Sequence, residues 1–444
     1  MSLASSKIPL NSWSGARPSL GHSCETDTLS LSRYIQAGEN LLAMLPPKSC
    51  RSPEQAHQAS VIHEPCRSLR RHFLTLYADN LYTSLTNGYS ARKSLRQLAF
   101  DAAISFPGLV PTPQQLMDER AKLQIDKEGR EIDQGLFFHA LLRSPTIGVH
   151  LADSALQPTT RAKDAFAEFH RNALLDLGSV LIEKRGSAAH ITINNSYCLN
   201  AEDDRSVDDM ETAVDLALLD DEVRVGVIRG GFMTHKRYIG RRVFSAGINL
   251  KALYAGQISY VDFILRREFG YINKLIRGFF FNDGTNKRGF GKPWIAAVDS
   301  FAIGGGAQLL LALDHIVADE NSYFSVPAAK EGIIPGLANL RLARFMGRRK
   351  ARQVILYGRQ IWAHEPDGLL LFDEVIEPAK MDLAIERNIQ RLSEPGVREN
   401  RHMLNLAEEP LEMFLHYAAE FALVQAELLY SEDVLGKVRG FAEA

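Results

Sequence analysis

The sequence predicts an α/β domain that is preceded by an all-α N-terminal domain. From about residue 30 to 175, apolar residues recur at the three- and four-residue spacing of amphipathic helices. From residue 176 onward, short apolar or alternating runs are separated by helical segments, which is the pattern of α/β proteins. Two glycine-containing turns, at 244–250 and 302–308, lie between strands and helices of this second part. We therefore place the domain boundary near residue 175.

The N-terminal part divides into a tail and a helical domain. Residues 1–29 are rich in Ser, Pro and Gly, and we expect a flexible tail there. The helical domain spans 30–175, with helices predicted at 31–45, 54–85, 90–104, 134–142 and 161–175. Phe106-Pro107-Gly108 ends the third of these, and Thr112-Pro113 is typical of the cap and first turn of a further helix.

The second domain, residues 176–444, begins with a predicted β-hairpin. Segments 179–185 and 188–195 alternate apolar and polar residues around Gly186-Ser187. The elements predicted after the hairpin are helix 206–221, strand 223–231, strand 292–300, helix 307–314, strand 315–320 and helix 410–430. This order predicts strands and helices in alternation, closed by C-terminal helices.

Composition excludes several classes of protein. The 444 residues are 45% hydrophobic and 23% charged, which is enough to bury a core without disulfides. Lys and Arg number 51 against 53 Asp and Glu, so the net charge of −2 argues against nucleic acid or an anionic membrane as partner. The four Cys lack C-x-x-C spacing, which favours a reduced, cytoplasmic protein. No signal peptide and no run of ~18 apolar residues is found, so we expect no membrane insertion.

The two glycine-containing turns are the strongest candidates for a site. The first reads Phe244-Ser245-Ala246-Gly247-Ile248-Asn249-Leu250, and the second contains Gly304-Gly305-Gly306. Glycines at a strand-to-helix junction let the backbone approach a ligand with its N–H groups exposed. The positive end of the following helix then stabilises a developing oxyanion. Tight packing of a turn against the sheet explains such glycines equally well, so the glycines alone do not decide.

Together with their surroundings, these turns resemble the crotonase (enoyl-CoA hydratase/isomerase) superfamily. The segments that carry the resemblance are 244–253, 292–336, 342–378 and 430–441. It covers about 178–441 and implies a crotonase-like ββα spiral, with C-terminal helices closing a thioester site in a homotrimer or homohexamer. It also implies that the backbone N–H groups of Ile248 and Gly305 form an oxyanion hole for a thioester carbonyl. The helical region 30–175 lies outside the core that the superfamily shares.

Two departures from the hydratases of this superfamily narrow the expected chemistry. Those enzymes carry one Glu two residues after the GGG run and a second Glu after a Pro further along. Here the two positions hold Gln308 and Ala328. Neither side chain transfers a proton at neutral pH, and each positioned acid or base contributes typically ~10²–10⁴-fold to such a reaction. We therefore expect an enolate-stabilising site that does not hydrate double bonds.

The whole chain resembles one branch of the superfamily, the cofactor-independent (3,5-dihydroxyphenyl)acetyl-CoA 1,2-dioxygenases of dihydroxyphenylglycine and glycopeptide antibiotic biosynthesis. The segments 200–231 and 233–275 and the GGGAQ run at 304–308 carry this resemblance. It implies that an arylacetyl-CoA and O₂ react at the α-carbon, giving (3,5-dihydroxyphenyl)glyoxylate and free CoA without cofactor or metal. The absence of H-E-x-x-H and of a local H-x-D/E motif agrees with a site that binds no metal.

The resemblance also implies roles for polar residues near the turns. Glu202, His235 and Arg267 are candidates for recognising ring hydroxyls, because Glu accepts from a phenol and Arg donates to a phenolate. Gln308 joins Ile248 and Gly305 as a catalytic candidate. Further substrate-binding candidates are Ser196, Lys236, Arg237, Tyr238, Ala246, Gly247, Asn249, Leu250 and Lys251. Solvated surface charges or ordinary loop residues are the alternative interpretation of these positions. Ile333, Ile334 and Val434 line either a dry pocket for O₂ or the core.

Two other functions remain open at this point. One is a crotonase-like acyl-CoA hydrolase, isomerase or decarboxylase that uses the same enolate-stabilising hole without O₂. The other is a crotonase-like scaffold that has lost its catalytic acids. Uptake of O₂ coupled to release of CoA separates the dioxygenase from both.

Overall fold

The computed structural model describes residues 10–281, 287–289 and 291–443. These residues form two compact units. The first comprises the described residues up to 151 together with 254–256 and 418–431, and all remaining described residues make up the second.

The division between the units differs from the boundary expected near residue 175. It falls inside α7 (Pro145–Ala155), so α8 (Thr160–Asn172) belongs to the second unit. There α8 packs against α9 (Asp204–Leu219), and Arg161 forms ion pairs with Asp208 and Asp209 of that helix. The helical periodicity of α8 is correct, but periodicity does not tell which unit a helix packs on.

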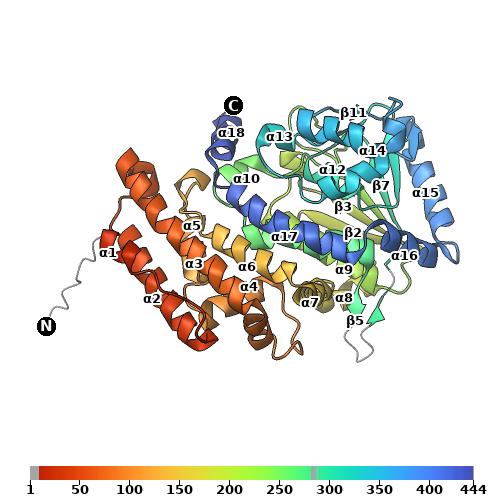
Figure 1. Cartoon of the computed structure of the whole chain (residues 1–444). Coiled ribbons are helices and arrows are strands. Elements are labelled where there is room, and N and C mark those ends of the chain that lie inside the picture. The colour runs from red at the N-terminus through yellow and green to blue at the C-terminus, as the bar shows by residue number, and fades with distance from the viewer. Residues whose placement is uncertain (1–9, 282–286, 290, 444) are drawn as a thin grey trace. The chain divides into compact units, whose positions relative to one another are not determined.

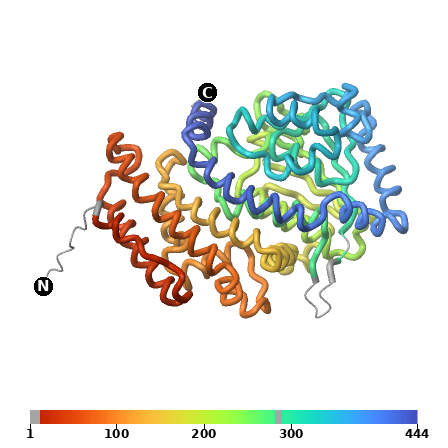
Figure 2. Tube along the Cα trace, viewed as in Figure 1, coloured from red at the N-terminus to blue at the C-terminus, as the bar shows by residue number. Residues whose placement is uncertain are grey.

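The first unit is helical, as predicted. Its helices include α1 (Leu10–Gly15), α2 (Cys24–Leu42), α3 (Pro53–Leu85), α4 (Leu95–Ser105), α5 (Pro113–Arg120) and α6 (Glu131–Arg143). Helix α3 packs against α2, α4 and α6, and Figures 1 and 2 show α2 and α3 as neighbouring segments. The Thr112 hydroxyl accepts from the Gln115 N–H, which confirms the predicted cap of α5.

The described part of the expected N-terminal tail is folded. Helix α1 and the start of α2 lie within residues 1–29, and Trp13 is buried and stacks on Tyr34 with 4.6 Å between the ring centroids. The Ser-rich composition concealed a helix cap, since the Ser23 hydroxyl accepts from the Thr26 N–H. Residues 1–9 lie outside the described residues.

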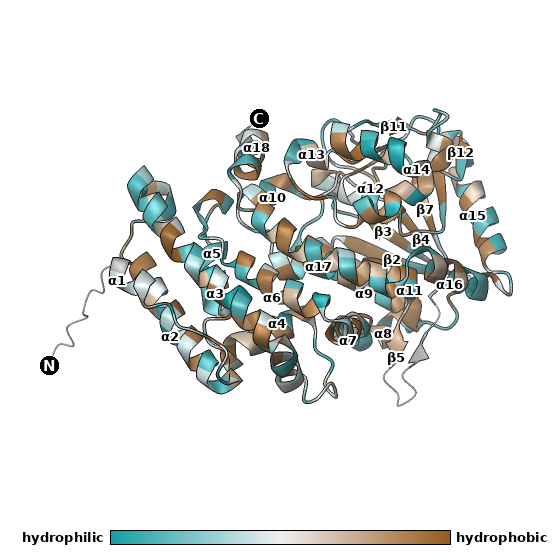
Figure 3. Ribbon diagram, in the orientation of Figure 1, coloured by the Kyte–Doolittle hydropathy of each residue, from teal (hydrophilic) through white to brown (hydrophobic). Residues whose placement is uncertain are grey.

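The second unit is built on a seven-stranded sheet of order β1-β2-β3-β4-β7-β9-β12. The strands are β1 (Leu174–Asp176), β2 (Val180–Arg185), β3 (Ala188–Ile193), β4 (Val225–Gly230), β7 (Trp294–Val298), β9 (His315–Asp319) and β12 (Glu374–Ile376). Strands β2 and β3 form the predicted hairpin, and β3 through β12 pair in parallel. The central strands β3, β4 and β7 are strongly hydrophobic (Figure 3), and every residue of β7 is buried.

A smaller sheet and several helices complete the second unit. The sheet consists of β8 (Phe301–Ile303), β10 (Tyr323–Ser325) and β11 (Ile361–Trp362), and β5 (Phe280–Phe281) pairs with β6 (Lys287–Arg288). The helices are α10 (Leu250–Tyr254), α11 (Asn273–Arg277), α12 (Gly305–Leu310), α13 (Ala328–Glu331), α14 (Ala338–Tyr357), α15 (Met381–Leu392), α16 (Val397–Glu408) and α18 (Glu432–Glu443). Helix α17 (Leu411–Leu428), predicted from its spacing, contains a further change between the units, after residue 417. No helix among the described residues has the length and apolar character needed to cross a membrane.

A π-helical segment precedes α11. It consists of η4 (Tyr260–Leu265) and η5 (Glu268–Ile272), and it contains Arg267. Gly270 allows close approach to α9, because a Cβ atom there would lie 2.7 Å from Oε1 of Glu211. Wider π-helical turns often occur at functional sites, where they redirect side chains.

Candidate active site

The first glycine-containing turn, between β4 and α10, is attached to the end of β8. Gly247 has a φ of +84°, a conformation that favours glycine, and its N–H donates to the Ser245 hydroxyl at 3.0 Å. The Ile303 N–H donates to the carbonyl of Ser245 at 2.9 Å. The turn is therefore held against the strand that leads into the second glycine run.

Pairing with Glu202 sets the direction of the Ile248 N–H. The Glu202 N–H donates to the Gly247 carbonyl at 2.7 Å, and the Asn249 N–H donates to the Glu202 carbonyl at 2.8 Å. Because the residues on either side of Ile248 make both bonds of this parallel bridge, the Ile248 N–H points away from Glu202. Within the described residues, this N–H has no hydrogen-bond acceptor.

The second turn brings the Gly305 N–H next to the first. Gly304 has a φ of +51°, and Gly305 is the first residue of α12, where a backbone N–H has no partner within the helix. A Cβ atom on Gly247 would lie 2.9 Å from the Ile303 carbonyl oxygen and 3.0 Å from the Gly305 nitrogen. The two turns are therefore in contact. In the described part of the chain, the Gly305 N–H also lacks an acceptor.

Arg267 joins three of the residues singled out from the sequence. Its Nε donates to Oε2 of Glu202 at 2.5 Å, and its Nη2 donates to Oε1 of Glu202 at 3.2 Å and to the Gly305 carbonyl at 2.6 Å. Its Nη1 donates to Oε1 of Gln308 at 3.1 Å and to Oε1 of Glu268 at 2.9 Å. All five N–H groups of the guanidinium are thus directed at acceptors within the protein.

Glu268 and Gly336 belong to this cluster but were missed from the sequence. The Glu268 side chain is 3% exposed. Gly336 has a φ of +44°, and a Cβ atom there would lie 2.3 Å from Oε1 of Glu268 and 2.4 Å from Oε1 of Gln308. Glycine at 336 therefore lets its loop cover both side chains. The Arg-Glu pair at 267–268 was visible in the sequence, but its burial beneath the Gly336 loop depends on residues far away in the sequence.

Burial and charge act oppositely on the ionisable groups of the cluster. Burial by itself lowers the pKa of Arg267, but the carboxylates, Glu202 foremost, outweigh it and the pKa is raised. Burial raises the pKa of Glu268 and outweighs the opposing effects of Arg267 and Arg341. The guanidinium is thus a fixed positive charge, and burial makes Glu268 harder to ionise.

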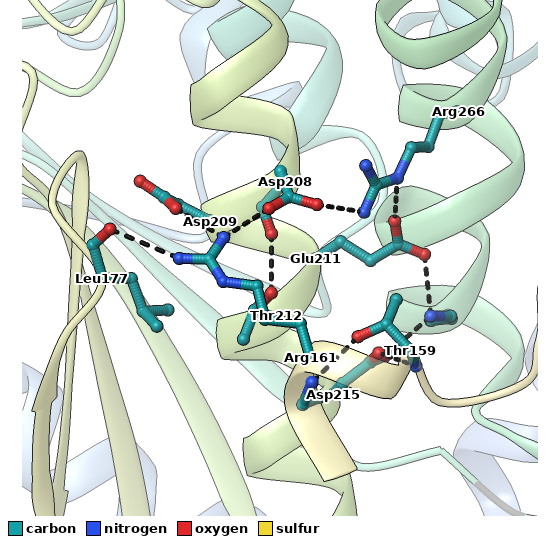
Figure 4. A network of polar contacts seen from close by, with 11 residues as sticks. Thr159, Arg161, Leu177, Asp208, Asp209, Glu211, Thr212, Asp215 and Arg266 are labelled. Atoms are coloured by element: carbon teal, nitrogen blue, oxygen red, sulfur yellow. Dashed lines mark hydrogen bonds and ion pairs between the residues drawn. The ribbon is translucent and has the colours of Figure 1, made fainter. Parts of the chain in front are cut away.

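A partly buried ionic network joins the π-helical segment to α9 (Figure 4). Arg266 donates to Oδ1 of Asp208 and Oε2 of Glu211, both at 2.6 Å. Lys274, which is fully buried, donates to Oε1 of Glu211 at 2.8 Å and to Oδ1 of Asp215 at 2.7 Å. All three acidic residues lie on α9. Because Arg266 is tied to α9, its neighbour Arg267 is directed toward Glu202 and the glycine turns.

The loop that carries His235 lies beside the first turn. The Tyr238 ring packs edge-on against Phe301, with 5.4 Å between centroids, in the same apolar cluster as Ala246 and Ile303. The backbone N–H of Arg237 donates to Nδ1 of His235, with 3.4 Å between the two nitrogens. Because Nδ1 accepts, Nε2 is the ring nitrogen that can donate to a ligand. No direct contact in the described part of the chain joins His235 to the Arg267 cluster.

The remaining candidates surround the turns without joining the cluster. Oδ1 of Asn249 accepts from the Ala252 N–H at 3.0 Å, so this side chain caps α10, which begins at Leu250. The Ser196 hydroxyl is 3.2 Å from the Thr234 hydroxyl, next to the His235 loop. Lys236, Arg237 and Lys251 are exposed.

The positions of the missing hydratase acids are also defined. Gln308 lies on α12 and is partly exposed, and Ala328 begins α13 and is buried. Ile333 and Ile334 are half-buried in the loop that follows α13. A Cβ atom on Gly332 would lie 2.9 Å from Cγ2 of the buried Val434, so this loop contacts α18.

One group of possible metal ligands occurs among the described residues. The ligand atoms of His170, Asp220 and Glu222 lie within 4.8 Å of one another. Lys184 donates to Asp220 at 3.0 Å and to Glu222 at 2.6 Å, so an ammonium group already compensates their charge. None of these residues belongs to the glycine turns or the Arg267 cluster.

Comparison with known proteins assigns the chain to a family. Residues 183–409 match the enoyl-CoA hydratase/isomerase family. The chain is 52% identical over 425 residues to a (3,5-dihydroxyphenyl)acetyl-CoA 1,2-dioxygenase of Amycolatopsis orientalis, an alignment that covers 96% of this chain and 98% of that protein. The chain belongs to the enoyl-CoA hydratase/isomerase family.

Two other known proteins match a smaller part of the chain. A short-chain-enoyl-CoA hydratase of Clostridium acetobutylicum is 30% identical over 209 residues, covering 47% of this chain and 72% of that protein. The solved structure of OdaA from Pseudomonas aeruginosa has a TM-score of 0.50 at 20% identity, covering 60% of this chain and all of that one. The predicted crotonase-like fold is confirmed. The Amycolatopsis protein differs from these relatives because its similarity extends through the helical unit.

Proposed function

We propose that this chain is a metal- and cofactor-independent dioxygenase. It converts (3,5-dihydroxyphenyl)acetyl-CoA and O₂ into (3,5-dihydroxyphenyl)glyoxylate, free CoA and a proton. The observation that carries this proposal is the 52% identity to the Amycolatopsis dioxygenase, because it extends over 96% of the chain and therefore over both units. The contact between the two glycine turns supports it independently.

The Ile248 and Gly305 N–H groups form the oxyanion hole in this proposal. Both lack an acceptor within the described residues, and their turns meet where Gly247 approaches the Gly305 nitrogen. A thioester oxygen that accepts from both gains most as it becomes an enolate, because donors fixed in advance stabilise developing charge. The dihydroxyphenyl ring delocalises the same charge.

Oxygenation then needs no redox group on the protein. The enolate transfers one electron to O₂, and recombination forms the C–O bond of a peroxide at the α-carbon. Attack of the terminal peroxide oxygen on the thioester carbonyl expels CoA as a thiolate. Loss of the second α-proton breaks the O–O bond and leaves the ketone and the carboxylate, while the thiolate takes up a proton. Both atoms of O₂ end in the product.

The side chains near the hole fit this chemistry better than hydration. Gln308 and Ala328 supply no acid or base, and the carboxylate of Glu202 is occupied by a bidentate pair with Arg267. Since Oε1 of Gln308 accepts from Arg267, its Nε2 group faces the opposite way and is available to the enolate or peroxide oxygen.

We assign recognition of the ring hydroxyls to Glu202, His235 and Arg267. Because every N–H of Arg267 already has an acceptor, a ring hydroxyl reaches the guanidinium by replacing one of them. Gln308 is the partly exposed one among those acceptors. Lys236, Arg237 and Lys251 are exposed near the turns and are assigned to the CoA phosphates.

The proposal also covers the oligomeric state, the cellular location and the biosynthetic role. We infer a cytoplasmic homotrimer or homohexamer that serves dihydroxyphenylglycine and antibiotic biosynthesis. Light scattering at micromolar concentration tests the assembly, and a monomer mass would contradict it.

The decisive experiment measures O₂ uptake and thiol release together. Purified protein, treated with strong chelators, is incubated with (3,5-dihydroxyphenyl)acetyl-CoA and with unsubstituted phenylacetyl-CoA. We expect one O₂ consumed per thiol released, with the dihydroxy substrate strongly preferred and with no visible absorption from flavin or haem. Thiol release without O₂ uptake would instead identify a hydrolase, and no reaction with either compound would favour a scaffold. Activity that tracks a bound metal would contradict the cofactor-independent mechanism.

A further inference from the structure

Glu268 is a buried carboxyl group beside the proposed reaction centre, and no step described above uses it. Its side chain is 3% exposed, and Oε1 accepts from Nη1 of Arg267 at 2.9 Å. The same Nη1 atom also serves Gln308. Glu268 and Gln308 therefore converge on one side of Arg267, beneath the Gly336 loop.

The charge of Arg267 is already balanced without Glu268. Glu202 receives Nε at 2.5 Å and Nη2 at 3.2 Å, which is the bidentate geometry of a strong Arg-carboxylate pair. Glu268 receives only one hydrogen bond from a group shared with Gln308. A second full negative charge here would leave the cluster negative next to an enolate and a peroxide anion.

The second oxygen of Glu268 has no partner. Oε2 is buried and makes no hydrogen bond among the described residues. A buried anionic oxygen without hydrogen-bond donors costs more free energy than a neutral carboxyl oxygen in the same position. We propose that Glu268 is protonated in the resting enzyme and is a positioning residue, which braces Arg267 against Glu202 and Gln308 without adding negative charge beside the reacting carbon.

The groups that face Glu268 come from several elements. Arg267 and Tyr271 lie on its own segment, Glu202 precedes α9, Arg341 lies on α14 and Tyr417 on α17. Among the described residues named here, Arg341 is the second cation, and both its Nε and Nη2 donate to Glu409, at 2.9 and 3.0 Å. Burial raises the pKa of Glu268 despite both arginines, in agreement with a neutral carboxyl.

This inference rests on the proposed function for its kinetic consequence. While Glu268 is protonated, it is uncharged and does not make turnover depend on pH. As pH rises through the pKa of Glu268, ionisation places a negative charge beside the enolate and turnover falls. A glutamine at this position is neutral at every pH and has nearly the same shape, so it keeps the brace and removes the fall.

Two variants and one spectrum test the proposal. Infrared difference spectra of the ligand-free full-length protein, wild type minus Glu268→Gln at pH 7, should contain a C=O band of a protonated carboxylic acid. The Glu268→Gln variant should retain kcat at neutral pH within about threefold and lose the alkaline fall that the wild type shows with the same substrate. Glu268→Ala should lose at least about tenfold, because Arg267 is no longer braced. Thermal unfolding of each variant checks that it is folded.

The outcomes separate this inference from the proposed function. Absence of the carboxylic acid band shows an ionised Glu268 and overturns the proposal, whatever the enzyme does. An alkaline fall that persists unchanged in Glu268→Gln also overturns it, since substrate ionisation contributes equally to both proteins. If wild-type protein consumes no O₂ with any arylacetyl-CoA, the proposed function fails, while the infrared result still decides the protonation state.

Discussion

Nη1 of Arg267 donates a hydrogen bond to Oε1 of Gln308 at 3.1 Å. Because a guanidinium only donates, this contact fixes which end of the amide faces Arg267 and leaves Nε2 to face away from it. The side chain that replaces the hydratase glutamate is thus oriented as a donor. An enolate or peroxide oxygen accepts from such a group, whereas a carboxylate in its place repels both.

The first prediction concerns this exchange of amide for carboxylate. Gln308→Glu should lower the rate of O₂ uptake by at least about tenfold at neutral pH, because it places a third carboxyl group on Arg267 and a negative charge near the enolate. Activity should recover in part at acidic pH, where the introduced carboxyl is neutral. O₂-electrode assays across pH measure both effects.

Gln308→Ala is the matched control for that prediction. It removes a hydrogen bond worth ~0.5–1.5 kcal/mol without adding charge, so its loss of rate should be smaller than that of Gln308→Glu. Equal rates of Gln308→Glu and the parent at neutral pH would rule out an anionic mechanism at this position.

The second prediction concerns the contact between the glycine turns. Gly247→Ala should lower kcat by ~10²-fold, the effect of losing one oxyanion-hole donor. The new Cβ would lie 2.9 Å from the Ile303 carbonyl oxygen and 3.0 Å from the Gly305 nitrogen, so one turn must shift. Steady-state kinetics with matched unfolding curves measure the loss.

Gly186→Ala tests whether backbone strain alone explains such a loss. Gly186 also has a positive φ, +57°, but nothing lies within 4 Å of a Cβ atom there. This variant should lose stability from backbone strain alone and keep its kcat. If Gly247→Ala kept its kcat as well, the assignment of the hole to these turns would be wrong.

Much of the fold was predictable because it is encoded locally. The hairpin around Gly186 and the cap at Thr112 depend on residues within a few positions of each other. The folded segment from α1 into α2 was not predictable in this way. In it Trp13 stacks on Tyr34, a contact between residues that composition does not connect.

The site was predictable where it depends on motifs. The candidates Glu202, Arg267, Gly305 and Gln308, far apart in the sequence, lie together in the structure, and their roles stay predictions. Glu268 was missed because its burial depends on the Gly336 loop, which lies far from it in the sequence. The Asn249 side chain caps α10, as its place just before a helix predicts, and its assignment to substrate stays a prediction.

The third prediction concerns the network in Figure 4. Lys274→Met should destabilise the protein by about 3–5 kcal/mol, because it leaves the buried carboxylates of Glu211 and Asp215 without their ammonium partner. Loss of kcat should accompany this effect, since the same network positions Arg267. Denaturant unfolding and O₂ uptake measure the two consequences.

An exposed ion pair provides the control for Lys274. Arg185→Met breaks the pair with Glu183, whose side chains are 59% and 36% exposed, and should cost no more than about 1 kcal/mol. Equal costs for the two variants would show that the buried network contributes no more than a surface pair.

The last prediction concerns the stability of the protein in acid. His190 on β3 has a buried Nε2 without a hydrogen-bond partner among the described residues, and burial first, then Arg185, lowers its pKa from 6.5 to about 4. The unfolded chain therefore binds this proton at a higher pH than the folded chain, so the free energy of unfolding falls as pH drops from 6.5 to 4. The loss is at most ~3 kcal/mol. His190→Gln removes this proton site. As pH drops across that interval, the free energy of unfolding should therefore fall less in the variant than in the parent. Unfolding curves at closely spaced pH values measure it, and parallel curves would show that His190 titrates alike in both states.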